Sequence, residues 1–310
     1  MLDVRRLRVL EAVAEHGSFS AAADELSFTQ SAVSQQIAVL ERETGMTLLQ
    51  RGPGGVRLTD AGKVLVTHTR AVLARLSDAE RELAAIAGLR GGRIRVASFP
   101  SAGATLVTEA VSVFKQRYPE VELSLSEGEP EDTVPALKRG ESDLALVFKY
   151  SNSPAGNDLL EGLDCIHLLD EPVFVVLPVD HPLAERKSIR LEQLAGEAWI
   201  GGCQGGVCNN MLRDWCLAAG FQPSVTLESN DHNVQVGLVA AGVGVTILPE
   251  LALKVPHPGV ALRPITRPSP MRQIYAAVPE EAYCSPATEA MIEVLESVAE
   301  PYKHQRRAAA

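Results

Sequence analysis

The chain has 310 residues, of which 46% are apolar, so it is long enough for about two domains with buried cores and is not wholly disordered. It carries no run of about 20 apolar residues, as a membrane span needs, and its start, MLDVRRLRVL, lacks the apolar segment of a secretory signal. The net charge is −10, yet the part up to Arg95 has 13 basic and 11 acidic residues, against 16 and 28 in the rest. Contact with a polyanion is therefore expected in the N-terminal part.

The first elements are predicted to be helices. Apolar residues recur at helical spacing over residues 7–14, and Gly17 ends that helix. The segment FSAAADELSFTQSAVSQQIAVLE (19–41) then predicts two helices joined by a short turn. Ser20 is expected to cap the first of these helices and Thr29 the second. This is the arrangement of a helix-turn-helix.

The second of these helices has two different faces. Val33, Ile37 and Leu40 fall within a narrow arc that faces a core. The opposite face carries amide, hydroxyl and small side chains, which can pair with base edges and let the helix approach a major groove closely. An ordinary helical hairpin with a solvated polar face is the alternative, but such faces usually carry Lys and Glu, and this one has neither. DNA readout is therefore favoured.

A short hairpin is predicted next. In LLQRGPGGVRLTDAG (48–62), two strands flank a Gly-Pro-Gly-Gly turn. Arg51 and Arg57 stand on either side of the turn, within reach of phosphates or a minor groove, unless they merely keep the hairpin soluble. The candidate DNA-contacting residues of the whole region are Ser20, Thr29, Gln30, Ser31, Ser34, Gln35, Arg51 and Arg57.

Residues 1–62 resemble the winged helix-turn-helix of LysR-type transcriptional regulators. The matching pieces are GSF (17–19) followed by alanines, QSAVSQQI (30–37) leading to Leu40-Glu41, and RLTDAG (57–62). Ser31 stands where the family often has proline, and Leu49-Gln50-Arg51 replaces the usual Leu-Phe-x-Arg, so the exact operator contacts are expected to differ. The resemblance implies a sequence-specific regulator that binds double-stranded operator DNA through residues 1–58 and also contacts RNA polymerase.

Residues 59–88 predict one long helix that Thr59 begins. Apolar residues follow the alternating 4-3 spacing of a heptad seam, which is typical of a two-stranded coiled coil, whereas a helix packed on its own domain has a wider apolar stripe. We therefore expect a homodimer, or the homotetramer that the family resemblance implies, with paired recognition helices on a two-fold operator. The seam residues assigned to dimerisation are Leu65, Val72, Leu76, Leu83 and Ile86. Residues 89–92 are expected to form a hinge.

From residue 93 onward, strand-like and helix-like segments alternate, which predicts an α/β domain with a largely parallel sheet. ESDLALVF, VLPVDHPLA, LAAGF and VAAGVGVTILP resemble the effector-binding domain of the same LysR-type family. The resemblance implies two Rossmann-like lobes of the periplasmic-binding-protein type (type II) over residues 93–303. Lobe I is expected at about 93–165 and 268–303, lobe II at about 166–267, and the crossovers near Asp164–Asp170 and Leu262–Arg272.

Sheets of this kind bind small molecules at the carboxyl ends of their strands. By position, seven residues are expected to line the cleft between the lobes: Ser98, Ser101, Phe148, Cys203, Gln204, Asn230 and Asp231. Hydroxyls and helix N-termini there favour a small polar or anionic metabolite as the effector, with no cofactor. Ordinary turn and capping chemistry is the alternative for each residue, above all for Asp231 as a helix N-cap.

The stretch GGCQGGVCNN (201–210) places two cysteines among glycines. A zinc site commonly has four ligands, and Cys203, Cys208 and Cys216 have no histidine near them, so no metal is expected. A phosphate cradle would need a lysine after the glycines, where two asparagines stand. The favoured role brings backbone amides close to the effector, with Cys203 in the wall and Cys216 in the core. A thiol redox switch between Cys203 and Cys208 is the alternative.

Two other classes of function are disfavoured. No GxSxG, HExxH or Walker motif indicates an enzyme, and a solute-binding transport protein would carry a signal peptide and lack the N-terminal head. Five cysteines without a regular framework are typical of a reducing cytoplasm, where we expect the protein to act without binding a membrane. The expected mechanism is allosteric: an effector in the cleft alters the angle between the lobes and thereby the spacing of the DNA-binding heads.

Overall fold

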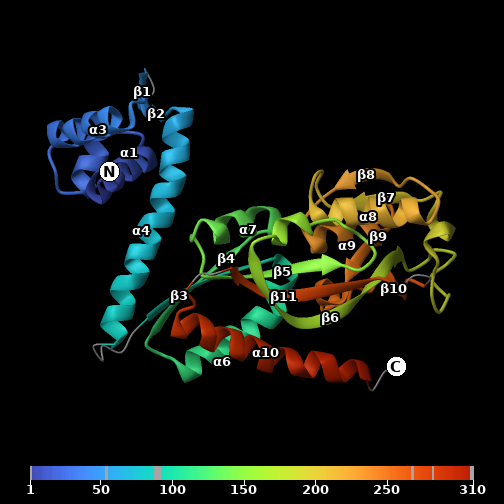
Figure 1. The fold of residues 1–310 in the computed structure, drawn as a ribbon. Coiled ribbons are helices and arrows are strands. Elements are labelled where there is room, and N and C mark those ends of the chain that lie inside the picture. Colours follow the sequence, from blue (N-terminus) through green and yellow to red (C-terminus); the bar gives the residue numbers. More distant parts are fainter. Residues whose placement is uncertain (1, 53–54, 87–91, 267–268, 281–282, 308–310) are drawn as a thin grey trace. The chain divides into compact units, whose positions relative to one another are not determined.

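A computed structural model describes residues 2–52, 55–86, 92–266, 269–280 and 283–307 (Figure 1). The chain divides into two compact units, one made mostly of residues 1–90 and the other of residues 91–137 and 142–310. Of the predicted hinge at 89–92, all but Gly92 lies outside the described residues. No helix among the described residues is long and apolar enough to cross a membrane.

Three helices open the N-terminal unit: α1 (Val4–His16), α2 (Phe19–Glu25) and α3 (Gln30–Thr44). As predicted, Gly17 ends α1 in the left-handed conformation (φ 59°), which glycine adopts without steric cost. Thr29 begins α3, because its Oγ1 accepts a hydrogen bond from the Ala32 amide at 3.2 Å. Val33, Ile37 and Leu40 of α3 are buried in the core of this unit, at most 3% exposed.

The predicted cap of α2 is wrong. Ser18, in extended conformation, is the N-cap, and its Oγ accepts a hydrogen bond from the Ala21 amide at 3.4 Å. Ser20 lies one residue inside α2 and is exposed. The helix therefore begins two residues earlier than predicted, and it does so because Phe19 packs into the core from its first position.

The wing consists of β1 (Leu49–Gly52) and β2 (Gly55–Leu58), paired antiparallel. The Val56 amide donates a hydrogen bond to the Gly17 carbonyl oxygen at 2.9 Å, which ties the wing to the end of α1. A Cβ at Gly55 (φ 104°) would come within 2.7 Å of that same oxygen, so only glycine permits this approach.

The long helix α4 (Asp60–Ile86) begins at Thr59, whose Oγ1 accepts a hydrogen bond from the Gly62 amide at 3.0 Å. Leu65 packs against the core of the N-terminal unit. Further along, the apolar seam leaves that core: Val72, Leu76 and Leu83 are 41%, 45% and 67% exposed. The side chain of Ile86, the last seam residue, lies outside the described residues.

In the second unit, one lobe is a sheet whose neighbouring strands run in the order β4–β3–β5–β11–β6. The strands are β3 (Gly92–Ser98), β4 (Val121–Glu127), β5 (Leu144–Tyr150), β6 (Leu163–Pro178) and β11 (Met271–Pro279). On one face, α6 (Thr108–Arg117) and α10 (Pro286–Arg307) pack over Val96, Leu146 and Ile274. On the other face, α7 (Pro130–Lys138) packs over Ala97 and Val147. Helix α6 is preceded by the short helix α5 (Pro100–Ala102) and the π-helical turn η1 (Gly103–Val107).

The other lobe is built around the second half of β6. There β6 pairs antiparallel with β9 (Thr246–Pro249) and β10 (Val260–Pro264). A bridge between Trp199 and Val245 joins β9 to a parallel pair, β7 (Ala198–Gly201) and β8 (Ser224–Glu228). The helices of this lobe are α8 (Val207–Ala218) and α9 (His232–Ala240), and short turns complete the unit: η2 (Asp158–Leu160), η3 (Leu191–Leu194) and η4 (Glu250–Leu253).

The two lobes share β6. Its residues up to Pro172 pair with β11, and those from Val173 onward pair with β9 and then β10. The chain therefore crosses between the lobes at Pro172–Val173, just beyond the segment near which the first crossover was predicted, 164–170. The pairs β3–β4, β3–β5 and β7–β8 are parallel. The prediction of a largely parallel sheet is wrong for the rest, because β6, β9, β10 and β11 pair antiparallel. Because β6 continues without a break from one sheet into the other, its sequence pattern does not mark the residue at which it passes between the lobes.

Candidate functional site

The outward surface of α3 is polar and carries no charged residue from Gln30 to Ala38. Gln30, Ser31 and Gln35 are exposed there, and Ser34 is half-buried. Amide and hydroxyl groups on a helix that can enter a major groove are suited to base edges, where Gln makes paired hydrogen bonds to adenine. The structure therefore presents together most of the side chains that were assigned to readout.

Thr29 and Ser31 are linked at the N-terminal end of α3. Their hydroxyl oxygens lie 3.0 Å apart, and Thr29 also accepts the capping hydrogen bond from Ala32. Both side chains are exposed, as is Ser20 on α2. Thr29 thus orients the tip of α3 whether or not it contacts DNA itself.

On the wing, Arg57 is exposed on β2, opposite Gln50 in the register of the hairpin. Arg51 lies on β1 opposite Val56, and its side chain is outside the described residues. An exposed guanidinium on a hairpin beside the helix-turn-helix is suited to phosphate contact, which positions a protein on DNA without reading sequence.

A cavity of about 310 Å³ lies between the two lobes of the second unit. Lobe I contributes Glu129, Glu131 and Asp132 from the start of α7, and lobe II contributes residues 203–209 and Asn230. Three of the seven predicted cleft residues, Cys203, Gln204 and Asn230, line this cavity. Asn230 also shapes the loop, because its Oδ1 accepts a hydrogen bond from the Cys203 amide at 2.9 Å.

Asp231 does not line the cavity. Its carboxylate caps α9 by accepting hydrogen bonds from the amides of Asn233 and Val234, at 2.8 and 3.4 Å. The capping alternative therefore describes its contacts in this structure.

Side chains from both lobes meet along α8. The Glu131 carboxylate accepts a hydrogen bond from the Val207 amide at the first turn of α8. Further along, Trp215 Nε1 donates to the Ser151 carbonyl oxygen at 3.1 Å, and the Ser153 hydroxyl donates to Asp214 Oδ2 at 2.6 Å. Helix α8 of lobe II is thus held to lobe I at both of its ends.

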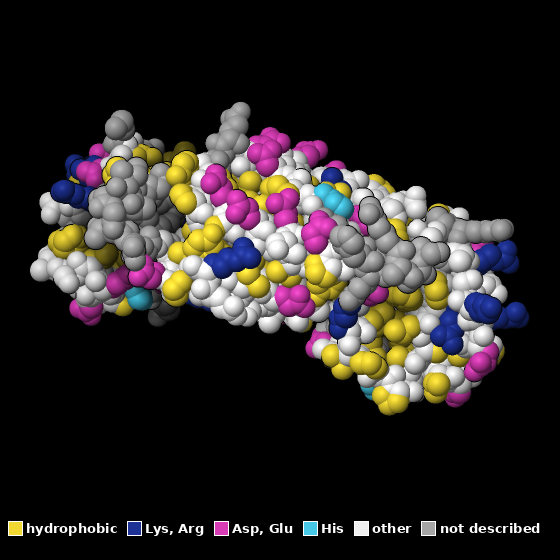
Figure 2. Space-filling model, turned by 90° about the horizontal axis from the view of Figure 1, so that it is seen from below, with side chains coloured by type: hydrophobic (Ala, Val, Ile, Leu, Met, Phe, Trp, Pro, Cys, Tyr) yellow, Lys and Arg dark blue, Asp and Glu magenta, His cyan; other side chains and the backbone are white. Residues whose placement is uncertain are grey.

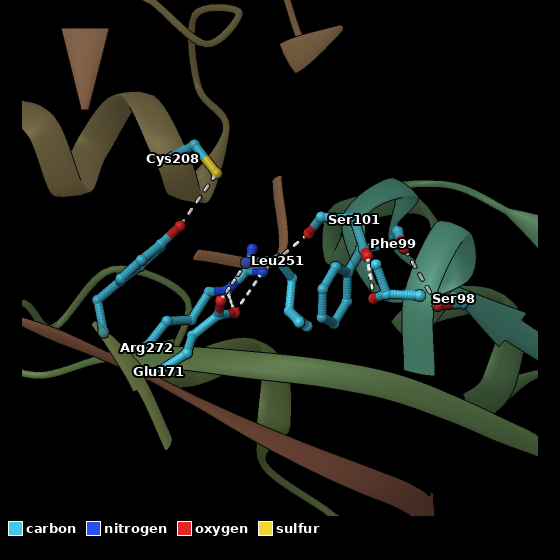
Figure 3. A network of polar contacts seen from close by, with 9 residues as sticks. Ser98, Phe99, Ser101, Glu171, Cys208, Leu251 and Arg272 are labelled. Atoms are coloured by element: carbon cyan, nitrogen blue, oxygen red, sulfur yellow. Dashed lines mark hydrogen bonds and ion pairs between the residues drawn. The ribbon is translucent and has the colours of Figure 1, made fainter. Parts of the chain in front are cut away.

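Beneath the cleft lies a buried ion pair that the sequence did not predict. Arg272 is 1% exposed and Glu171 is 0% exposed (Figure 3). Arg272 Nε donates a hydrogen bond to Glu171 Oε1 at 2.7 Å, and its Nη2 forms an ion pair with the same oxygen at 2.6 Å. The second carboxylate oxygen of Glu171 accepts the Leu251 amide at 2.6 Å. The guanidinium also lies 4.7 Å from the ring centre of Phe99 and 5.0 Å from that of Phe148, at distances typical of cation–π contact.

The other three predicted cleft residues belong to the surroundings of Arg272. The Ser101 hydroxyl accepts a hydrogen bond from Arg272 at 2.8 Å, and Phe148 packs edge-on against Phe99 with ring centres 4.8 Å apart. Ser98 is 1% exposed and donates its hydroxyl hydrogen to the Phe99 carbonyl oxygen at 3.1 Å. None of these three side chains is among the described residues that line the cavity.

The cavity is acidic. Among the described residues that line it, three are carboxylates and none is Lys, Arg or His. Burial, and then the neighbouring Glu131, raise the pKa of Glu129 to about 7. Acidic side chains also lie on the face of the molecule that Figure 2 shows.

The cysteines near the cleft differ in exposure. Cys203 is exposed, whereas burial and then Glu129 raise the pKa of Cys208 to about 12, and its Sγ lies 3.6 Å from the Tyr150 hydroxyl. Cys216 is 0% exposed, and burial raises its pKa to about 12. Because the thiolate is the reactive form, Cys208 and Cys216 are unreactive in this arrangement. No group of three or more His, Cys, Asp or Glu that would hold a metal ion occurs among the described residues.

One further titratable group faces this region. His232 stands at the first position of α9, and burial, followed by the charge of Arg272, lowers its pKa to about 4. It is therefore neutral at neutral pH.

Sequence reasoning missed the residues whose partners are remote in the chain. Arg272 and Glu171 are 101 positions apart, and Glu131 and Val207 are 76 apart. A signal was present for the first pair, since each is a charged residue at the edge of an apolar strand pattern, in EPVFVVLP and MRQIYAAVP. A charge in such a place is rarely buried without a partner.

Comparison with known proteins agrees with this division of the chain. Residues 4–63 match the family described as "Bacterial regulatory helix-turn-helix protein, lysR family", and residues 87–300 match "LysR substrate binding domain". The dual regulator GltC of Bacillus subtilis is 31% identical over 287 residues, covering 92% of this chain and 94% of GltC. A hydrogen peroxide-inducible genes activator of Escherichia coli O6:H1 is 30% identical over 276 residues, covering 88% of each chain. The structure of full-length CbnR with its target DNA superposes with a TM-score of 0.69 at 21% identity, covering 96% of this chain and 100% of CbnR.

Proposed function

The chain belongs to the LysR family of DNA-binding transcriptional regulators, and on that premise we propose how it binds DNA and how it is controlled. A homodimer, paired through the seam of α4, places two copies of α3 on a two-fold operator. A small molecule in the cavity between the lobes controls operator binding or promoter activation. The protein acts in the cytoplasm, as a homodimer or homotetramer that also contacts RNA polymerase.

The observation that carries the DNA-binding part is the outward face of α3. Gln30, Ser31 and Gln35 are exposed on a helix whose other side is fixed in the core. Such a face can enter a major groove with its amides and hydroxyls free for base edges. The Arg57 side chain on the wing supports the same interpretation, since a cation near the helix-turn-helix can contact the phosphates of the DNA backbone.

The α4 seam supports dimerisation. Val72, Leu76 and Leu83 are spaced at 4 and 7 residues and are exposed within one chain. Exposure of this regular apolar row to water is unfavourable. Pairing with the same row of a second copy buries it.

The test is binding to DNA upstream of the protein's own gene, measured by fluorescence anisotropy over a range of salt concentrations. The expected result is a complex that is tighter than with scrambled DNA of the same length and that weakens as salt rises. Equal affinity for both DNAs overturns the proposed function.

Thiol-based control is the second candidate, favoured by the 30% identity to a hydrogen peroxide-inducible activator. It would use the exposed Cys203 with Cys208, whose raised pKa keeps it protonated here. A Cys203→Ser variant that retains a peroxide-dependent change in operator affinity excludes this pair as the switch.

A further inference from the structure

We infer that the cavity between the lobes takes a cationic effector, an organic molecule with at least one protonated nitrogen. The inference rests on the proposed function, because it names the chemical class of the effector for that same site. It replaces the polar or anionic metabolite expected from the sequence with a ligand of opposite charge.

The wall of the cavity supplies negative charge from one short segment. Glu129, Glu131 and Asp132 all line it, at the start of α7. Oε1 of Glu131 is used by the Val207 amide, but its Oε2 is buried and has no hydrogen-bond partner among the described residues. A buried carboxylate with only one donor is costly, and the positive charge of a cation in the cavity would lower that cost through space.

The Arg272 guanidinium is not available to an anion. Arg272 gives its hydrogen bonds to Glu171 and Ser101, and the rings of Phe99 and Phe148 lie against it. It is 1% exposed and does not line the cavity. Its positive charge is already balanced by a carboxylate at 2.6 Å.

The N-terminus of α8 is likewise occupied. Helix N-termini attract anions through their free amides, and this was the reason to expect an anionic effector. Here the Glu131 carboxylate holds that position. An anionic effector would have to displace Glu131 and remain beside Glu129 and Asp132, whereas a cation is attracted by all three charges with the existing contact intact.

A cation also provides a route to regulation. The three carboxylates belong to lobe I, and the loop and helix facing them, residues 203–209, belong to lobe II. Burial, and then the charge of Glu131, raises the pKa of Glu129, so the carboxylates of this segment repel one another when they are ionised. A cation that contacts lobe II and reduces this repulsion has its highest affinity for the conformation in which α7 lies against α8.

The test compares ligands of one size and opposite charge on the full-length protein. 1,4-Diaminobutane, succinate and 1,4-butanediol share a four-carbon skeleton and suit a cavity of 310 Å³. Binding is measured by isothermal titration and by the shift in thermal unfolding midpoint. We expect saturable binding of the diamine, and none of succinate or the diol.

Variants connect that binding to the cavity. Glu131→Gln and Asp132→Asn keep shape and oxygen acceptors but remove charge, and each should weaken diamine binding about tenfold. Glu192→Gln is the matched control, since Glu192 is exposed on η3 and does not line the cavity. Unchanged diamine affinity in both cavity variants overturns the inference.

Other results also decide it. Saturable binding of succinate without the diamine, or no binding of any probe, overturns the cationic effector. Stabilisation by magnesium chloride but not by the diamine overturns its organic nature. Operator binding, measured separately on the same preparations, stands or fails independently, so failure of this inference is distinguishable from failure of the proposed function.

Discussion

The Glu131 carboxylate accepts the backbone N–H of Val207, so a side chain from lobe I caps a helix of lobe II. Most helix caps lie within a few residues of the helix they serve. This one spans 76 positions and a boundary between lobes, so the stability of α8 depends on where lobe I stands.

Glu131→Ala should lower the free energy of unfolding by about 1 kcal/mol, the usual cost of losing a capping side chain. Glu131→Gln retains an oxygen acceptor for the Val207 amide and should cost less. Thermal unfolding of the full chain without ligand measures both, with Glu192→Ala as the control. Equal midpoints for Glu131→Ala and the wild type would show that the contact contributes nothing.

Gln35→Ala should weaken operator binding by about 1–3 kcal/mol, because Gln35 is exposed on the readout face of α3. Ligand affinity in the cavity should not change. Gln222→Ala, at an exposed position in the second unit, is the control. The role assigned to Gln35 fails if the variant distinguishes operator from scrambled DNA as well as the wild type does.

Arg272→Met should destabilise the second unit by about 3–5 kcal/mol, because it leaves the Glu171 carboxylate buried without its cation. Adding Glu171→Gln should restore part of the loss. The matched control is Arg139→Met, which breaks a partly exposed pair with Glu141 (36% exposed on both sides) and should cost about 0–1 kcal/mol. Urea unfolding measures all three, and an equal cost for both arginines would contradict the importance of burial.

Leu76→Glu should separate the dimer, since it places like charges on the α4 seam of both copies. Thr67→Glu is the control: nine residues earlier, at about 100° per residue, it lies on the opposite side of the same helix and is exposed. Sedimentation velocity should show a smaller species for Leu76→Glu alone. A dimer that survives Leu76→Glu would place the interface elsewhere.

The pKa of Glu129 predicts the sign of a pH effect. Its carboxyl titrates near 4.5 when unfolded and near 7 when folded, where it faces Glu131, Asp132, Glu127 and the cation of Arg272. The folded state therefore holds the extra proton between these values, and stability should fall as pH rises through that window.

His232 acts in the opposite sense. Its pKa is lowered from 6.5 to about 4, so its contribution to stability grows as pH rises from 4 to 6.5. The two slopes oppose each other in the wild type. In Glu129→Gln, thermal midpoints should rise with pH between 5 and 6.5 more steeply than in the wild type. Parallel profiles would show that Glu129 titrates normally.

Local signals in the sequence were sufficient for the DNA-binding head. Gly17, Thr29 and Thr59 act on residues within four positions, so their roles followed from spacing. The one local error, Ser20 for Ser18, arose because two serines both precede the alanine run. The apolar seam of α4 could also be predicted from spacing, because its heptad pattern lies entirely within one helix.

The cleft was harder to predict because its properties arise from pairs remote in sequence. Helix N-termini and serines indicated an anion site, but folding brings Glu131 to α8 and Glu171 to Arg272 and so takes up the anion-binding groups. These pairings determine the sign of the charge that remains unpaired in the cleft. The sequence of either segment alone does not show that sign.

The strand β6 has a consequence for how the second unit unfolds. Lobe I is closed by β11, which follows lobe II in the chain, and both lobes use β6 as a sheet member. Unfolding of either lobe removes the hydrogen-bonding partners of half of β6. It also releases the connecting segments on which the other lobe depends. The lobes therefore form one cooperative folding unit, and hydrogen exchange along β6 should report a single opening free energy on both sides of Pro172.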